Sequence, residues 1–132
     1  MLGEQIVEWR GKVMGRRVLD AEGATLETSV SASGSLRGTQ ANENITFVAK
    51  PVSDGVIRGK GQGVIMAENL EMATAEADAI GRMTANGVKW RGAIFYRTAS
   101  TGKLSFLNNT AGVLEAEVDM EGNFTEKIWE WK

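Results

Sequence analysis

Two pairs of carboxylates are the first residues in this sequence that could do chemistry. Glu76 and Asp78 are two residues apart, as are Glu115 and Glu117. Residues at this spacing share one face of an extended strand. Two such carboxylates could act as a general acid and a general base. Lys and Arg side chains on neighbouring strands are their alternative partners, and such exposed ion pairs are ordinary features of sheets. We expect the ion-paired role for both pairs.

Histidine and cysteine are both missing from the 132 residues. The missing imidazole removes the commonest general base near neutral pH and the commonest metal ligand. The missing thiol removes Cys-His catalysis, disulfides and thiolate metal sites. We therefore expect no metal and no cofactor. Because no recognisable catalytic motif takes their place, a binding role is favoured over an enzymatic one.

The charge of the chain argues against nucleic acid as a partner. Fifteen basic and seventeen acidic residues give a net charge of −2 and a pI near 5.3, whereas proteins that bind duplexes need a basic field to displace counterions from phosphates. No apolar run approaches the roughly 18 residues of a membrane span, and the first residues do not resemble an export signal. The expected location is the cytoplasm, with no membrane partner.

Alternation with a period of two dominates the chain and predicts strands. In 25–36, Leu26, Val30 and Leu36 fall on one face, and serines and Glu27 fall on the other. The same separation occurs near the N-terminus, around Trp9, and in 56–68. Sixteen glycines, spread along the chain against one proline, mark turns at intervals typical of successive hairpins.

The segment 68–83 is ambiguous because alanine and glutamate are strong helix formers. A helical stripe is possible there. A strand is favoured because Ala73, Ala75, Ala77 and Ala79 alternate with polar residues and a hairpin turn follows. With strands at 88–98, 113–119 and 124–131, the count reaches about eight.

Eight antiparallel strands in one domain, 1–132, predict an all-β fold. The economical arrangement is a closed or nearly closed barrel with meander topology, since closure removes exposed sheet edges. We expect the glycine row Gly59, Gly61 and Gly63 and the alanine row 73–79 to face inward. Small side chains on both rows favour a lumen with room for a ligand, although Trp and Phe side chains could fill it instead.

The second half of the chain resembles a known family. The segment Asp54-Gly-Val-Ile-Arg-Gly-Lys-Gly-Gln-Gly63, the aromatic strand Gly92-Ala-Ile-Phe-Tyr96 and the segment Thr101-Gly-Lys-Leu-Ser-Phe-Leu107 resemble the allene oxide cyclase-like barrel. Dirigent proteins and bacterial families of unknown function are similar. The resemblance covers about 54–131. It implies an eight-stranded barrel, frequent oligomerisation and an apolar lumen that in some members binds or cyclises a hydrophobic molecule. It transfers no catalytic residue.

Three functions remain open at this point, and the first is the binding of a small hydrophobic molecule in the lumen. The residues expected to touch this ligand are Trp9, Trp90, Phe95, Tyr96 and Phe106, although which face of 88–98 points inward is open. The second function is a cofactorless cyclase or isomerase. In this enzyme Glu76, Tyr96 or Asn108 would stabilise charge in the lumen. The third is a structural oligomer without a ligand. In all three, 101–110 is expected to form the rim of any pocket.

A homo-oligomer is expected from the last strands. Both faces become apolar from Ile94 to Tyr96, which indicates that the strand is covered on both sides. Trp129 and Trp131 share one face and belong either to the core or to the same contact. A second copy of the chain would cover this face, and a local loop is the alternative cover.

Overall fold

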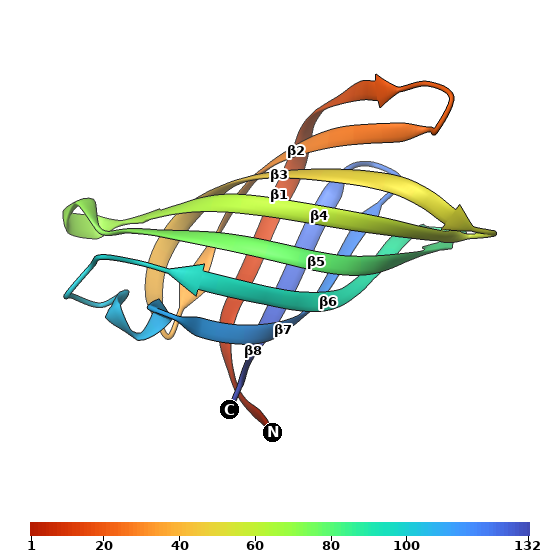
Figure 1. Ribbon diagram of the computed structural model, residues 1–132. Helices are drawn as coiled ribbons and strands as arrows, with labels where there is room; N and C mark the ends of the chain where they lie inside the picture. Colours follow the sequence, from red (N-terminus) through yellow and green to blue (C-terminus); the bar gives the residue numbers. More distant parts are fainter.

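The computed structural model describes all residues from Met1 to Lys132 and forms a closed eight-stranded barrel (Figure 1). Each strand is antiparallel to its neighbours in the chain, and β8 pairs with β1 to close the barrel. This confirms the predicted all-β meander barrel. The strands are β1 (Leu2–Asp20), β2 (Thr25–Leu36), β3 (Thr39–Ser53), β4 (Val56–Ala67), β5 (Met72–Thr84), β6 (Gly87–Arg97), β7 (Thr110–Asp119) and β8 (Asn123–Trp131).

The ambiguous segment 68–83 is a strand for most of its length. Glu68–Leu70 forms a single 3₁₀ turn, η1, and β5 begins at Met72. Asn69 in that turn has a φ of 59°, so the backbone cannot continue as a helix there. Ala73 and Ala75 face the interior, at 2% and 4% exposure. The alternation of alanines therefore indicated the structure better than their helix propensity did. Neither of the two 3₁₀ turns has the length to cross a membrane.

Glycines in the barrel wall lie beneath large inward side chains. A Cβ added at Gly59 would lie 2.7 Å from the Trp90 ring, and one added at Gly34 would lie 2.9 Å from the Trp9 ring. A Cβ at Gly63 would collide with the carboxylate of Glu43. These glycines thus provide space for three bulky groups that project into the lumen.

The end of the barrel nearest the chain termini, on the left and bottom of Figure 1, is sealed. The loop between β6 and β7 folds over it through the 3₁₀ turn η2 (Ser105–Leu107). Leu104 and Leu107 have no exposed area and belong to the hydrophobic core. We call this the sealed end.

Glu71, just before β5, fixes that loop. Its carboxylate accepts hydrogen bonds from the Leu104 backbone N–H, at 3.0 Å, and from the Ser100 hydroxyl. These hydrogen bonds, with the nearby Lys103, hold the pKa of Glu71 below its usual value. The Thr110 hydroxyl donates to the Phe106 carbonyl at 2.6 Å, so the loop is also anchored where β7 begins.

The opposite end, which carries the hairpin turns β1–β2, β3–β4, β5–β6 and β7–β8, has no such plug. Several inward-facing side chains there are only partly buried and pack against the core, although Val118 and Phe124, beside the β7–β8 turn, are buried. We call this the open end. Its partly buried inward side chains are Val13, Ile45, Phe47, Ala49, Ile57, Ala77, Ala79 and Val88.

Candidate functional site in the barrel lumen

A cavity of about 70 Å³ lies inside the barrel toward the open end. This volume can hold several water molecules or a small organic group. Glycine residues on β4 and alanine residues on β5 create the space, because larger side chains at these positions would fill it. The lining residues are Ile45, Phe47, Gly59, Gly61, Ala77, Ala79, Trp90, Leu114, Ala116, Phe124 and Glu126.

Aromatic rings form a large part of the cavity wall. The rings of Phe47 and Trp90 meet edge to face, with centroids 5.6 Å apart and an interplanar angle of 72°. Phe124, from β8, contributes a third ring. The edge-to-face contact between Phe47 and Trp90 is energetically favourable and orients both side chains.

Two carboxyl groups are buried in the lumen. Glu126 lies on β8 between Trp9 of β1 and Ala116 of β7, and is 8% exposed. Glu43 lies on β3, opposite Ala32 and Ile65, and is 4% exposed. No lysine or arginine shares their environment, because every basic side chain of the chain is exposed.

Burial keeps Glu126 protonated at neutral pH and favours the protonated form of Glu43. Desolvation raises the pKa of Glu126 to about 8. Desolvation also raises the pKa of Glu43 well above its usual value, and the nearby Glu126 raises it further. Neither shift is opposed by a hydrogen bond or a cation. The two groups are therefore acids without the partners that buried acids ordinarily have.

Two further polar groups in the lumen lack partners. The hydroxyl of Tyr96 and the indole N–H of Trp9 are buried and make no hydrogen bond. Burial, with the neighbouring Glu43 and Glu126, raises the pKa of Tyr96 well above 10, so its hydroxyl stays a donor. An unsatisfied buried donor costs about 1–3 kcal/mol. The lumen thus combines an apolar wall with two buried carboxyls that no cation offsets and two buried donors without a partner.

The structure brings together only some of the predicted ligand-contacting residues. Trp9, Trp90 and Tyr96 face the interior, at 0%, 7% and 1% exposure. Phe95 is 55% exposed on the outer face of β6 and Glu76 is exposed opposite it on β5. The expectation that Phe95 and Glu76 face the lumen is wrong, because strict alternation places Ile94 and Tyr96 inward and turns residue 95 out.

The predicted rim loop lies away from the cavity. Phe106 packs beneath Arg37, whose guanidinium carbon is 4.5 Å from the ring centroid. Asn108 accepts a hydrogen bond from the Thr98 backbone N–H at 3.4 Å and lines an outer groove between the loop and the β4–β5 turn. The loop seals its end of the barrel, so the predicted rim is a plug and the cavity is reached from the other end.

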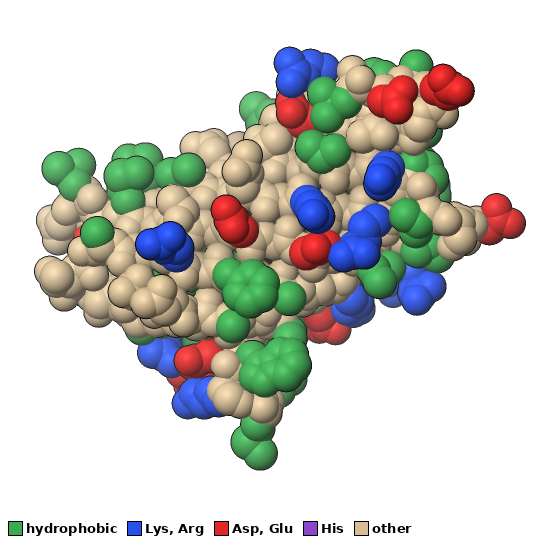
Figure 2. All heavy atoms as spheres, in the orientation of Figure 1, with side chains coloured by type: hydrophobic (Ala, Val, Ile, Leu, Met, Phe, Trp, Pro, Cys, Tyr) green, Lys and Arg blue, Asp and Glu red, His purple; other side chains and the backbone are tan.

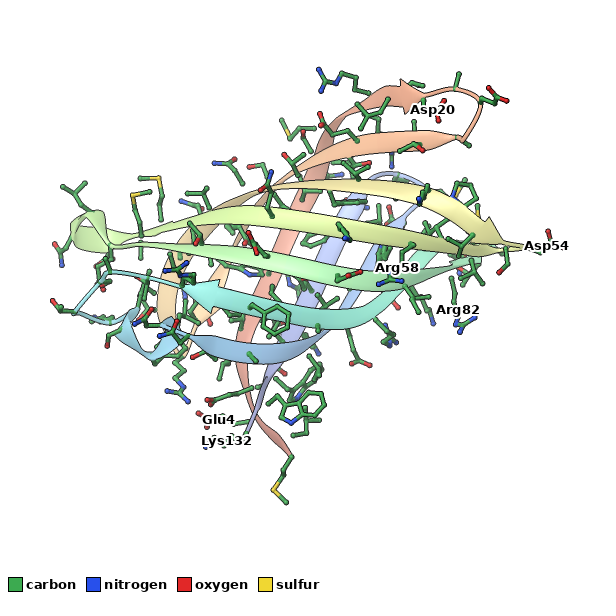
Figure 3. The ribbon with its side chains drawn as sticks, viewed as in Figure 1. Glu4, Asp20, Asp54, Arg58, Arg82 and Lys132 are labelled. Carbon is green, nitrogen blue, oxygen red and sulfur yellow. The ribbon has the colours of Figure 1, made fainter.

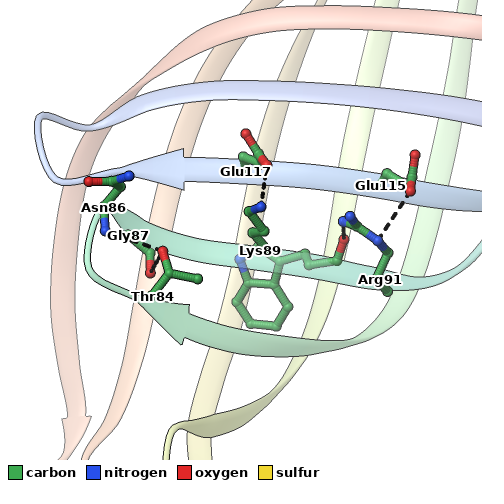
Figure 4. Close-up of polar contacts among 8 residues, drawn as sticks. Thr84, Asn86, Gly87, Lys89, Arg91, Glu115 and Glu117 are labelled. Carbon is green, nitrogen blue, oxygen red and sulfur yellow. Dashed lines mark hydrogen bonds and ion pairs between the residues drawn. The ribbon is translucent and has the colours of Figure 1, made fainter.

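All four paired carboxylates on the surface were expected to be ion-paired, and three of them are. Asp78 contacts Arg58 at 2.9 Å; Arg58 projects from the outside of the barrel in Figure 3. Figure 4 shows the neighbouring pairs Lys89–Glu117, at 3.8 Å, and Arg91–Glu115, at 3.2 Å. Glu76 has no ion-pair partner.

Sequence reasoning missed Glu43 and Glu126. A signal was present, since each glutamate stands in the apolar row of its strand. Glu43 alternates with Ala41, Ile45 and Phe47, and Glu126 stands between Phe124 and Ile128. A charged residue in an inward row is unusual in a strand and marks a buried acid.

Comparisons with known proteins place the chain by its fold. No protein-family model and no curated protein matches the sequence. A crystal structure of a protein of unknown function from Clostridium acetobutylicum superposes with a TM-score of 0.81 and 14% identity, covering 98% of each chain. One of a conserved protein of unknown function from Rhodopseudomonas palustris gives 0.76 and 8% identity, covering 99% of each chain. The chain therefore shares its eight-stranded barrel fold with bacterial proteins of unknown function.

Proposed function

We propose that the barrel binds a small, mainly apolar molecule in its lumen, and that this molecule enters through the open end. The observation that carries the proposal is the cavity of about 70 Å³, whose wall is apolar except for Glu126. Ligand sites in proteins are concave and mostly apolar, with a few polar groups that fix orientation. The mouth of a small barrel is a common place for one.

The packing of the lumen favours a ligand over a purely structural barrel. Protein interiors are ordinarily filled to high density. Here Gly61, Ala77 and Ala79 leave space in the lumen, and Tyr96 and Trp9 each bury a donor without a partner. A barrel with only a structural role would gain stability from a larger side chain at residue 77 and from polar partners for these donors.

The proposal is tested with a substitution that fills the cavity. Ala77→Leu adds apolar volume to the lumen, and Glu76→Leu places the same leucine side chain on the outer face of the same strand, where it cannot fill the cavity. We expect saturation-transfer NMR to detect n-butanol on the wild type and on Glu76→Leu, and to lose the signal on Ala77→Leu. An equal signal on all three proteins would contradict lumenal binding. Circular dichroism checks that each variant is folded.

A second candidate function is a cofactorless isomerase or cyclase, which the resemblance to allene oxide cyclase-like barrels also suggests. The specific observation in its favour is Glu126, which lines the cavity with a pKa of about 8. A group that titrates near the working pH is suited to general acid–base catalysis. If this candidate is right, exchange of an acidic C–H of a bound ketone with deuterated water should be faster with the wild type than with Glu126→Gln. Equal exchange rates with the two proteins would contradict this second candidate function.

We also propose that a second copy of the chain covers the outside of β6–β8. In this region Phe95 and Trp131 are 55% and 60% exposed, and Leu2, opposite Trp131, is 58% exposed. Apolar side chains gather there in the space-filling view (Figure 2). The outer apolar face consists of Leu2, Ala93, Phe95, Ala111, Val113, Trp129 and Trp131, which are neighbours across the register of β6, β7, β8 and β1.

This face suits pairing with itself. None of its residues is charged, so two copies related by a twofold axis would meet without like-charge repulsion. Large contiguous apolar patches on soluble proteins ordinarily mark interaction sites. We expect light scattering coupled to gel filtration to give at least a dimer for the wild type. Phe95→Glu should give a monomer, whereas Ile80→Glu, on the outside of β5, should keep the wild-type mass. A wild-type monomer would contradict the proposal.

A further inference from the structure

The polar end of the lumen has an acid and no base. Glu126 lines the cavity with no hydrogen bond or cation opposing its burial, and the nearest aromatic walls come from Phe47, Trp90 and Phe124. All lysines and arginines lie on the outside of the barrel. A buried acid in natural proteins ordinarily has a cationic or hydrogen-bonding partner. Glu126 therefore lacks, within the protein, the partner that a buried acid ordinarily has.

We infer that the lumenal ligand is a small organic amine, which binds as its ammonium ion with Glu126 as the counter-ion and its apolar part against the aromatic wall. The inference rests on the proposed lumenal binding and adds the chemical class of the ligand. Carboxylate and aromatic rings together are the environment that proteins offer to organic cations. The ammonium would supply both the charge and the hydrogen bonds that Glu126 lacks.

The rest of the lumen discriminates against other ligand classes. The titratable groups that face Glu126 are Glu43 from β3 and Tyr96 from β6; β1 and β7, which flank it, present Trp9 and Ala116. A ligand carboxylate would therefore meet two acids and no cation. A neutral alcohol would leave Glu126 protonated and gain one ordinary hydrogen bond. An ammonium alone converts the buried acid into a compensated ion pair.

Binding of an ammonium ion beside Glu126 should depend on pH, because Glu126 must lose its proton. Below pH 8 the free protein carries the proton on Glu126, so the ammonium binds only as that proton leaves to solvent. Affinity for the amine should therefore rise as the pH increases from 6 to 8 and then level off. It should fall again above about pH 10, where an alkylamine loses its own charge. Binding of an uncharged molecule would show no such dependence below pH 8.

The experiment compares three molecules of one shape, n-butylamine, n-butanol and butyrate, by NMR titration of the protein at pH 8. We expect n-butylamine to bind about tenfold more tightly than n-butanol, and butyrate to bind more weakly than either. Glu126→Gln should remove the preference for the amine. Glu117→Gln, which removes an exposed carboxylate on the adjacent strand β7, should keep it.

The outcomes distinguish a failure of the amine inference from a failure of lumenal binding itself. Binding of n-butanol as tight as that of n-butylamine would overturn the amine inference and leave lumenal binding intact. Binding of none of the three, with the wild type folded, would overturn both. A preference for the amine that survives in Glu126→Gln, or that is unchanged between pH 6 and 8, would overturn the assignment of Glu126 as the counter-ion.

Discussion

At the sealed end of the barrel, Leu104 and Leu107 enter from a loop and have no exposed area, whereas at the open end Ile45 and Phe47 project from a strand and remain partly exposed. The same eight strands supply both ends. The difference therefore comes from the connections: one long loop, fixed by Glu71, folds back into the barrel, and short hairpin turns at the other end cannot. The interior of an eight-stranded barrel can be filled by side chains or can hold one small ligand, and here the loop fills only one end.

The comparison also locates the polar groups. Glu126 lines the cavity of the open half, and Tyr96 belongs to the packed core beside β7, where Thr110 follows the plug. The molecule is thus closed where the plug completes its apolar packing, and open where Gly61, Ala77 and Ala79 leave the cavity. Polar groups without partners occur in both halves, because Tyr96 lacks a hydrogen bond within the packed core. A ligand in the cavity would complete the packing of the open half and supply Glu126 with a partner.

The largest expected effect concerns the acids of the lumen. Glu126 keeps its proton up to about pH 8 in the folded protein, whereas the unfolded carboxyl ionises near pH 4.5. Between these values the folded state binds more protons, so the free energy of unfolding should fall as pH rises. At about 1.4 kcal/mol per pKa unit the loss is several kcal/mol. Urea unfolding at pH 5 and pH 8 measures it.

Glu126→Gln should flatten this dependence, and Glu117→Gln, with its exposed carboxylate, should leave it as in the wild type. Glu43 acts in the same direction, so some slope should remain in Glu126→Gln. Wild-type stability that is equal at pH 5 and 8 would show that the lumen is wet enough to ionise both acids freely.

The next effect compares the two ends directly. Leu107→Ala removes a fully buried side chain from the plug and should cost about 2–5 kcal/mol of unfolding free energy. Ile45→Ala, at the open end, should cost about 1–2 kcal/mol, because part of its side chain already contacts water. Guanidinium unfolding of both variants is the measurement. A larger loss for Ile45→Ala would mean that the open end is in fact closed in solution.

A smaller effect separates the barrel wall from the β1–β2 hairpin, whose turn projects beyond the barrel at the upper right of Figure 1. Gly34→Ala would collide with the Glu8 carbonyl and press on the Trp9 ring, and should cost about 1–3 kcal/mol. Gly15→Ala, with no atom within 4 Å of the added carbon, should change stability by less than about 0.5 kcal/mol. Thermal unfolding of the two variants should differ accordingly, and equal midpoints would contradict the packing described for Trp9.

Much of the fold could be predicted because alternation in strands is a local signal. Thr25–Leu36 forms β2 with the predicted bounds, and the glycine and alanine rows face inward. The orientation of Phe95 could not be predicted from a strand whose two faces are both apolar. Its side chain points outward because its neighbours Ile94 and Tyr96 point into the core.

The candidate site was harder to predict than the fold. The role of Leu104 and Leu107 as a plug depends on how a loop folds over the barrel, which no periodic pattern encodes. Glu43 and Glu126 were detectable as charges within apolar rows, but their isolation depends on the absence of any basic side chain across the lumen. That absence becomes visible only when all eight strands are arranged around the axis.

The most direct test of this account is the titration of the two buried carboxyls, followed by NMR of protein labelled with ¹³C at the glutamate side-chain carboxyls. The account predicts that Glu126 titrates with a midpoint near pH 8, and that Glu43 titrates well above 4.5, the ordinary value for a glutamate. If both instead titrate near pH 4.5, the ordinary value for a glutamate, the lumen is solvated, and the buried acids on which the proposed binding chemistry depends do not exist.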